Sequence, residues 1–280
     1  MELRQTVVDD LPELHALFLA AIGEVYRRHA FDPPAPPLAV FQAQQGHILE
    51  TGLAVVAVDG DEPVGFGSAW TRGDEWFLAS LFVAPGAQAR RLGSVLLDAV
   101  WGEGHARRRT ITDAIQPVSN ALYARRGLVP ATPLLVFEGL PAGAAAILES
   151  AGRGDATELS ALDAAAYGFD RALDHPLWER AARRTLWRRA GEPVAYSYAF
   201  PGGSLGPIAG VDPAAAAAAL ESELARAAVP VTLRIPGSSR SLVEVALRCR
   251  LRLTPTPGLL LGSRGTKPPV ALAIGGYTLF

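Results

Sequence analysis

The residues best suited to chemistry lie in the stretch FVAPGAQARRLGSVLL, residues 82–97, where a strand is expected to end and a helix to begin. The first turn of a helix presents backbone N–H groups without intrahelical partners, and the helix dipole adds partial positive charge, so anions bind there. Small residues would let a phosphate approach the backbone, and arginines would pair with it. These residues are Ala89, Arg90, Arg91, Gly93 and Ser94. Two interpretations stay open, a phosphate cradle and a plain connection.

Composition excludes several classes of protein. The 280 residues are 49% hydrophobic and carry a formal net charge of -2, which disfavours a dedicated nucleic-acid binder. The single cysteine, Cys249, excludes an internal disulfide framework. The sequence has neither an N-terminal signal layout nor an apolar run of about 18–20 residues, the length that crosses a membrane. We therefore expect a cytoplasmic protein without membrane or nucleic-acid partners.

The hydrophobic pattern predicts the elements that must position this turn. A strand over residues 3–8 precedes a helix that Asp9 or Asp10 caps. The proline-rich stretch 27–37 interrupts the helical pattern, and a second helix is expected over residues 38–51. Three strands then lead into the turn, the next helix covers residues 90–104, and a strand, a helix and a strand follow. This order predicts a mixed α/β sheet.

The second half of the sequence repeats the first. DLPELHAL matches DATELSAL, EPVGF matches EPVAY, VAP matches VDP, and RRGLVP roughly matches RCRLRL, always in the same order. We therefore expect two tandem domains, residues 1–140 and 148–280, with a linker near residues 139–154. The alternative is that an unrelated α/β domain follows the first.

The element order and two motifs resemble the GNAT acyltransferase superfamily. In that family a Gln/Arg-x-x-Gly-x-Gly/Ala turn holds the pyrophosphate of acetyl-CoA, and residues 88–93 read QARRLG. Gln88 and Gly93 fit the pattern, whereas Arg91 stands where the family has its first glycine. The segment NALYARRGL, residues 120–128, is similar to the family's downstream motif, with Leu128 in place of the common Phe.

The resemblance implies an acetyl-CoA cosubstrate. The residues expected to contact it are Phe82, Val83, Gln88, Ala89, Arg90, Arg91, Leu92, Gly93, Ser94, Asn120 and Tyr123. By the resemblance, Asn120 faces the pantetheine arm and Tyr123 is the general acid for the leaving thiolate. The alternative for Tyr123 is an ordinary residue of an amphipathic helix.

The expected activity is direct transfer of an acetyl group to a primary amine of a small molecule. A backbone N–H near Phe82 or Val83 would stabilise the oxyanion. Glu75, which strict alternation places on one face with Phe77, Ala79 and Leu81, is the first candidate base. The competing interpretation is a non-catalytic acyl-CoA sensor.

Acceptor contacts are expected from the loop after the first helix. Tyr26, His29 and Asp32 could line an acceptor pocket, or the segment could be only a proline-stiffened surface loop. The histidines and Cys249 show no metal-ligand spacing, so we expect no metal. A monomer or a weak homodimer is expected.

The second copy is expected not to bind CoA. By sequence offset, Gln88 corresponds to Ala216, Arg91 to Ala219, and Gly93 to Glu221, which would place a carboxylate at the helix start. By the same method Tyr123 corresponds to Ala246, so the acid is absent.

Overall fold

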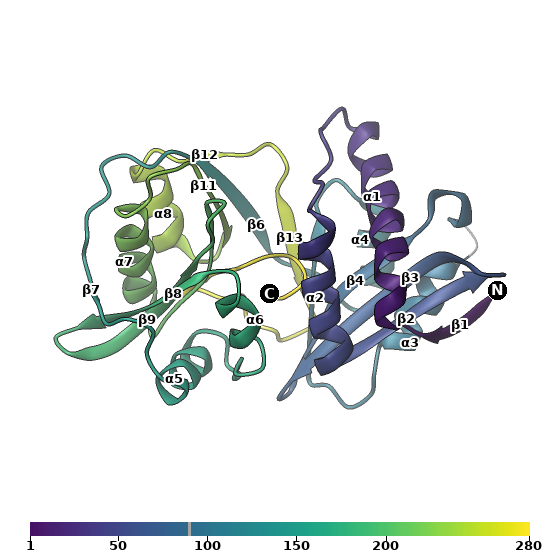
Figure 1. Cartoon of the computed structure of the whole chain (residues 1–280), viewed down its shortest axis with the longest axis horizontal. Helices are drawn as coiled ribbons and strands as arrows, with labels where there is room; N and C mark the ends of the chain where they lie inside the picture. The colour runs from purple at the N-terminus through teal and green to yellow at the C-terminus, as the bar shows by residue number, and fades with distance from the viewer. Residues whose placement is uncertain (89–90) are drawn as a thin grey trace. The chain divides into compact units, whose positions relative to one another are not determined.

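A computed structural model describes residues 1–88 and 91–280, and the chain divides into two compact units (Figure 1). The first unit is Met1–Leu128 and the second is Val129–Phe280. Both combine helices with β-strands, which confirms the expected mixed α/β fold. None of the helices within the described ranges has the length and apolar character needed to cross a membrane.

The first unit is built on a five-stranded sheet with the order β1-β2-β3-β4-β5. Strands β1 to β4 pair in antiparallel fashion, and β4 pairs with β5 in parallel. The elements are β1 (Glu2–Gln5), a 3-10 turn (Val8–Asp10), α1 (Leu11–Arg28), α2 (Leu38–Thr51), β2 (Gly52–Asp59), β3 (Glu62–Arg72), β4 (Glu75–Val83), a 3-10 turn (Pro85–Ala87), α3 (Leu92–Val100), β5 (Arg107–Asp113) and α4 (Pro117–Arg125).

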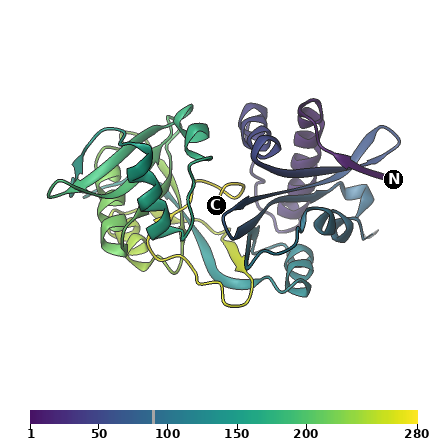
Figure 2. The ribbon, with the colours of Figure 1, turned by 90° about the horizontal axis from the view of Figure 1, so that it is seen from below.

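Helices cover both faces of this sheet (Figure 2). Helices α1 and α2 lie on one face, and α3 lies on the other. The apolar stripe of α1 includes Leu11, Leu14 and Leu17, which pack into a buried cluster with residues of α2 and the central strands. At the start of α1, the Asp10 carboxylate accepts hydrogen bonds from Arg4 and from the Val7 N–H instead of capping the helix. The bonds from Arg4 lower the pKa of Asp10.

A β-bulge in β4 changes which side chains share a face. The register between β3 and β4 shifts between the pairs Ser68–Ser80 and Ala69–Leu78, so Ala79 is the extra residue. As a result, the Trp76 indole donates to a carbonyl of α3 whereas Ser80, four positions later, accepts from Gln45 of α2. The expectation that Glu75 shares a face with Ala79 and Leu81 is therefore wrong, because the bulge breaks the period-two alternation.

Strands β4 and β5 pair along only part of their length. Their parallel register runs from Glu75–Arg107 to Leu78–Thr110, although β4 continues to Val83 and β5 to Asp113. We call residues 79–83 and 111–113 the β4–β5 fork. The hydroxyl of Thr110 donates to the Leu78 carbonyl at 2.9 Å and fixes the point where the strands separate.

The second unit has a sheet with the order β13-β6-β11-β10-β9-β8-β7, with β12 paired to β6 and β14 to β10. Its elements are β6 (Val129–Gly139), β7 (Glu149–Ser150), α5 (Ala156–Ala166), α6 (His175–Glu179), β8 (Arg183–Arg189), β9 (Glu192–Ala199), β10 (Ser204–Gly210), α7 (Pro213–Leu224), β11 (Val231–Pro236), α8 (Arg240–Arg248), β12 (Arg252–Leu253), β13 (Gly258–Gly262) and β14 (Leu272–Ala273).

The two faces of this second sheet can be told apart on β9. Tyr196 donates to Asp163 of α5, whereas Ser197 donates to Glu223 of α7. Because neighbouring strand residues point to opposite faces, α5 and α7 lie on opposite sides of the sheet. The arrangement repeats that of α1 and α3 on the first sheet.

The units divide after Leu128, ahead of the domain end that we expected at residue 140. Strand β6 pairs with β11, β12 and β13, so the strand that we expected to finish the first domain belongs to the sheet of the second unit. The boundary between the two compact units thus differs from the domain boundary that the sequence repeat predicts.

Candidate functional site

The start of α3 has the geometry of an anion site. Arg91 precedes the helix with φ +59°, the left-handed region that favours glycine. Leu92 and Gly93 open the first turn, where backbone N–H groups have no intrahelical acceptor. The residue type departs from the family turn at Arg91, but the backbone conformation is the one that a glycine would give.

Gly93 has room for a side-chain carbon among the described residues. A Cβ added there would meet Leu122 Cδ2 at 3.6 Å and Val83 Cγ2 at 3.9 Å, which are ordinary contacts. Gly93 also lacks the positive φ that strains other residues. The described residues therefore do not require a glycine at this position. Val83 belongs to β4 and Leu122 to α4, so both elements border Gly93.

Several of the other expected contact residues belong to the end of β4 and the start of α3. Phe82 and Val83 are half-buried at the end of β4, on one arm of the fork. The Gln88 side chain is exposed and donates to the Val83 carbonyl at 3.4 Å. Leu92 is buried and Ser94 is half-buried. Ala89 and Arg90 lie outside the described residues.

Helix α4 supplies one polar group next to the fork, Asn120, and also carries Tyr123. The Asn120 amide donates to the Asp113 carbonyl at 3.4 Å, while its Oδ1 is buried and lacks a hydrogen-bond partner among the described residues. A buried acceptor without a donor is costly, so this atom is suited to an N–H from a bound molecule. Tyr123 is buried, and burial raises the pKa of its hydroxyl, which therefore stays protonated at neutral pH.

One acidic residue at the fork was not singled out from the sequence. Asp113 ends β5, three residues beyond the last pair with β4, or roughly 10 Å along the strand. The hydroxyl of Tyr26 from α1 donates to its carboxylate at 3.1 Å. Burial and this carboxylate raise the pKa of Tyr26. The available signal was that Asp113 is the one charged residue in TITDAI, residues 110–115, the strand expected after the helix over residues 90–104.

Tyr26 is the one expected acceptor residue that the structure brings to the fork. His29 and Asp32 are exposed in the segment that follows α1. Their assignment to an acceptor pocket stays a prediction.

Glu75 occupies a buried ion-pair cluster at the paired end of β4. Its carboxylate lies 3.2 Å from Arg107 Nε and 2.7 Å from the Arg109 guanidinium, both on β5. Burial raises the pKa of Glu75, and the two guanidinium groups oppose that rise. The pairing favours a structural role, and its role as a base stays a prediction.

The equivalent turn of the second unit has a different construction. Strand β10 ends at Gly210 and α7 begins at Pro213, so only residues 211–212 connect them, compared with residues 84–91 in the first unit. The Asp212 carboxylate accepts from the Ala215 N–H and so occupies the helix start. An added Cβ at Gly210 would lie 2.5 Å from the Ala216 nitrogen, which shows that helix and strand are in direct contact.

The sequence offset assigned the wrong residues to the turn between β10 and α7. Glu221 lies near the end of α7, not at its start, and forms an ion pair with Arg248 at 2.6 Å. The carboxylate at the helix start is that of Asp212, because only two residues connect β10 to α7. The match between Tyr123 and Ala246 agrees with the elements, since both are the seventh residue of nine-residue helices, α4 and α8.

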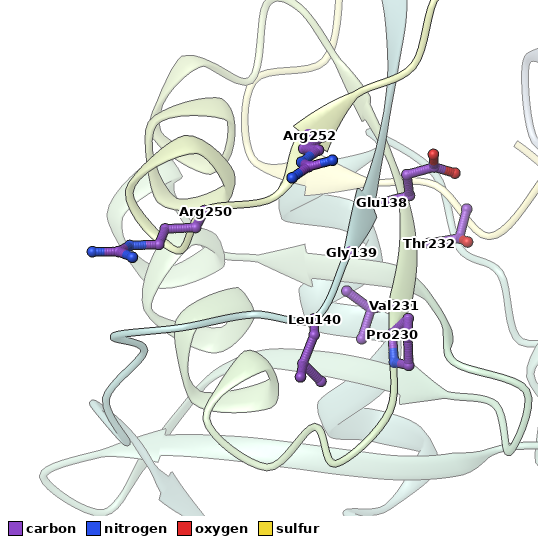
Figure 3. Close-up of a pocket in the computed structure, with 8 residues that line it drawn as sticks. All are labelled: Glu138, Gly139, Leu140, Pro230, Val231, Thr232, Arg250 and Arg252. Atoms are coloured by element: carbon purple, nitrogen blue, oxygen red, sulfur yellow. The ribbon is translucent and has the colours of Figure 1, made fainter.

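A hollow of about 550 Å³ in the second unit lies where the end of β6 and the start of β11 meet the segment after α8. Figure 3 shows Arg250 and Arg252 on one side of β6, and Glu138 and Thr232 on the other. Its charged side chains do not converge on one point, so we assign it no ligand. In the described ranges, no group of three or more metal-ligating side chains comes together.

Replacing Arg91 by glycine should stabilise the protein by about 1 kcal/mol, because a side chain at positive φ is strained and glycine is not. Urea unfolding of Arg91→Gly measures this, with Arg91→Ala as the control, which keeps the Cβ and should gain nothing. If Arg91→Gly were no more stable than Arg91→Ala, the backbone at position 91 would not be strained.

Replacing Glu75 by glutamine should destabilise the protein by about 3 kcal/mol, because it leaves two arginines without their carboxylate. Glu62→Gln, at an exposed strand end, is the matched control and should change the free energy of unfolding little. Lost activity with unchanged stability would instead support Glu75 as the base.

Comparison with known proteins relates the first unit to a known family. Residues 13–128 match the model of the acetyltransferase (GNAT) family. No curated protein matches the chain. The chain is similar to the structure of a candidate acetyltransferase from Pyrococcus horikoshii, at 18% identity and a TM-score of 0.78, over 100% of this chain and 95% of that one.

A second solved structure is a GCN5-related N-acetyltransferase from Sphaerobacter thermophilus, at 15% identity and a TM-score of 0.61, over 96% of this chain and 98% of that one. At these identities the likeness shows the fold. The family match covers the segment that holds the turn, the fork and α4. Residues 13–128 therefore form an acetyltransferase domain of the GNAT family.

Proposed function

We propose that the first unit transfers an acetyl group from acetyl-CoA to a primary amine of a small molecule. The observation that carries the proposal is that the described residues leave room for a side chain at Gly93, at the start of α3 and beside the end of β4. A glycine that the fold does not require, in the first turn of a helix, is suited to a phosphate in contact with the backbone.

The residues around the fork fit the rest of such a cosubstrate. The pyrophosphate would lie on the N–H groups of Leu92 and Gly93, with Arg91 adding charge. The unpaired Oδ1 of Asn120 would accept from an amide of the pantetheine arm. Acetyl-CoA supplies a thioester, whose carbonyl carbon an amine can attack.

Two groups of the chain serve the reaction. A backbone N–H on the β4 arm, near Phe82 or Val83, would stabilise negative charge on the carbonyl oxygen, because such donors are fixed before the reaction begins. The Tyr123 hydroxyl keeps its proton at neutral pH and would donate it to the departing sulfur.

Asp113 defines the acceptor. Its carboxylate is half-buried, held by Tyr26, and lies at the open end of the fork. A carboxylate in that position attracts an ammonium group and orients it by charge-assisted hydrogen bonds. The proposed acceptor is therefore a molecule whose amine is cationic at neutral pH and gives up a proton to water before its nitrogen attacks the thioester carbonyl.

Gly93→Ala should weaken acetyl-CoA binding by about tenfold or more, because a methyl group would fill the space against the backbone. Stability should not fall, since the added Cβ meets only ordinary contacts. Isothermal titration measures the Kd. Gly86→Ala, where a Cβ meets nothing within 4 Å, is the control and should leave the Kd unchanged. An unchanged Kd in Gly93→Ala would contradict the proposed phosphate position.

Tyr123→Phe should lower kcat by about 100-fold without changing the Kd of acetyl-CoA, because it removes only the proton donor. Thiol release with a panel of amines measures turnover. Tyr198→Phe, at a buried tyrosine of the second unit, serves as the control. Equal turnover by Tyr123→Phe and the wild type would rule out the acid role. Tight acetyl-CoA binding without turnover in the wild type would favour the sensor.

Asp113→Asn should raise the KM for the amine by about tenfold, since the ammonium loses its charged partner, and should leave the Kd of acetyl-CoA unchanged. Steady-state kinetics with saturating acetyl-CoA measures the effect. Asp32→Asn removes an exposed carboxylate of the loop and should leave KM unchanged. The opposite ranking of the two variants would move the acceptor site to the loop.

A further inference from the structure

The second unit contains its own fork, and part of the chain fills it. Strands β10 and β11 pair in parallel only at Ser204–Thr232 and Leu205–Leu233. Beyond that point β14 pairs antiparallel with β10, and the Ile274 N–H donates to the Arg234 carbonyl of β11 at 2.9 Å. A strand from the last part of the sequence therefore lies between β10 and β11.

Two glycines permit this strand to approach closely. An added Cβ at Gly206 of β10 would lie 2.5 Å from the Ile274 carbonyl oxygen. An added Cβ at Gly275 would lie 3.0 Å from Pro207 Cδ and 3.2 Å from its nitrogen. The neighbouring Gly276 is different, because a Cβ there meets nothing within 4 Å. Contact with β10 is thus tight at Gly275 and ends at Gly276.

The segment ends in a buried polar pocket between α5 and α6. Arg171 is fully buried, donates to the Leu279 carbonyl at 2.8 Å and also donates to the Phe280 carbonyl. The Phe280 ring is buried and meets Tyr167 edge to face, with ring centroids 5.6 Å apart. Arg171 also pairs with Asp174, so the pocket keeps a counter-charge of its own.

Arg171 is fixed from several sides. Its guanidinium lies over the Tyr167 and Trp178 rings, 4.7 and 4.6 Å from their centroids. Its backbone N–H donates to Asp163, which also accepts from Tyr196 and contacts His175. Arg171 is thus a rigid, buried donor that forms charge-assisted hydrogen bonds with two backbone carbonyls of this segment.

We propose that the second unit is a peptide-binding module, and that residues 271–280 of the same chain are its ligand. Recognition has two parts, strand addition in the β10–β11 fork and bonds from Arg171 to the Leu279 and Phe280 carbonyls. The ligand class is an extended peptide with a glycine at the tight contact and an aromatic residue five positions after it. This binding site differs from the proposed acetyl-CoA site and does not depend on it.

The connection to the segment suits a ligand held in cis. Residues 263–271 join β13 to β14 without a helix or strand, and Arg264 and Val270 are exposed. A Cβ added at Gly265 would meet no atom of the described residues within 4 Å, and this glycine has a turn conformation with φ +85°. The connection can therefore be cut while the bound segment stays in place.

The test uses the full chain with the recognition sequence of a site-specific protease inserted between Arg264 and Gly265. After cleavage, a fluorescent peptide of residues 268–280 is added in excess, and its anisotropy reports uptake. The cut chain should keep its cooperative thermal transition and take up the peptide. Loss of that transition, or no uptake, would overturn the proposal, because the segment would then be a fixed part of the core.

Competing peptides test the mode of recognition. The Gly276→Ala peptide should compete as well as the wild-type peptide, whereas Gly275→Ala and Phe280→Ala should compete at least about tenfold less well, since one clashes with β10 and the other empties the pocket. Equal competition by all three variant peptides would overturn the proposal.

The intact chain gives an independent measurement. Gly275→Ala should speed amide hydrogen exchange at residues 272–274 and leave β8 and β9 protected, with Gly276→Ala as the control. Faster exchange throughout the second sheet would contradict a separable segment.

Discussion

The early end of strand pairing between β4 and β5 is the constraint on which the first unit depends. Past Leu78 and Thr110 the strands separate, and in the described residues β4 has no further strand partner on that edge. Backbone N–H and C=O groups of an unpaired edge need partners, so the edge is ready to bind an extended molecule. The start of α3, Asn120 and Asp113 are all placed around this one separation.

In the second unit, residues of the chain itself occupy the corresponding fork and helix start. Its fork holds a strand of the chain itself, and its shorter turn lets Asp212 cap α7, whereas no side chain of the described residues caps α3. Ala246 stands where α4 has Tyr123. The two units therefore repeat an arrangement of elements but differ at the edge, the turn and the helix that would make a transferase site.

The sequence predicted much of this arrangement because the determining signals are local. Hydrophobic periodicity located α2 and the central strands, and the residues around Gly93 identified the turn. The bulge at Ala79 was not predictable by alternation, since it depends on pairing with β3. The role of Asp113 depends on Tyr26, which is distant in sequence, and the place of residues 271–280 depends on a fork that only the folded sheet creates. The offset between copies failed at Glu221 because the lost residues lie inside the turn itself.

The central claim is that a chain with two related units has one site for acetyl-CoA, at the fork of the first. Isothermal titration of the full chain with acetyl-CoA tests this most directly through the stoichiometry. The account predicts one molecule bound per chain, with binding weakened by Gly93→Ala. Two molecules per chain, or one molecule whose binding is unaffected by Gly93→Ala, would contradict it.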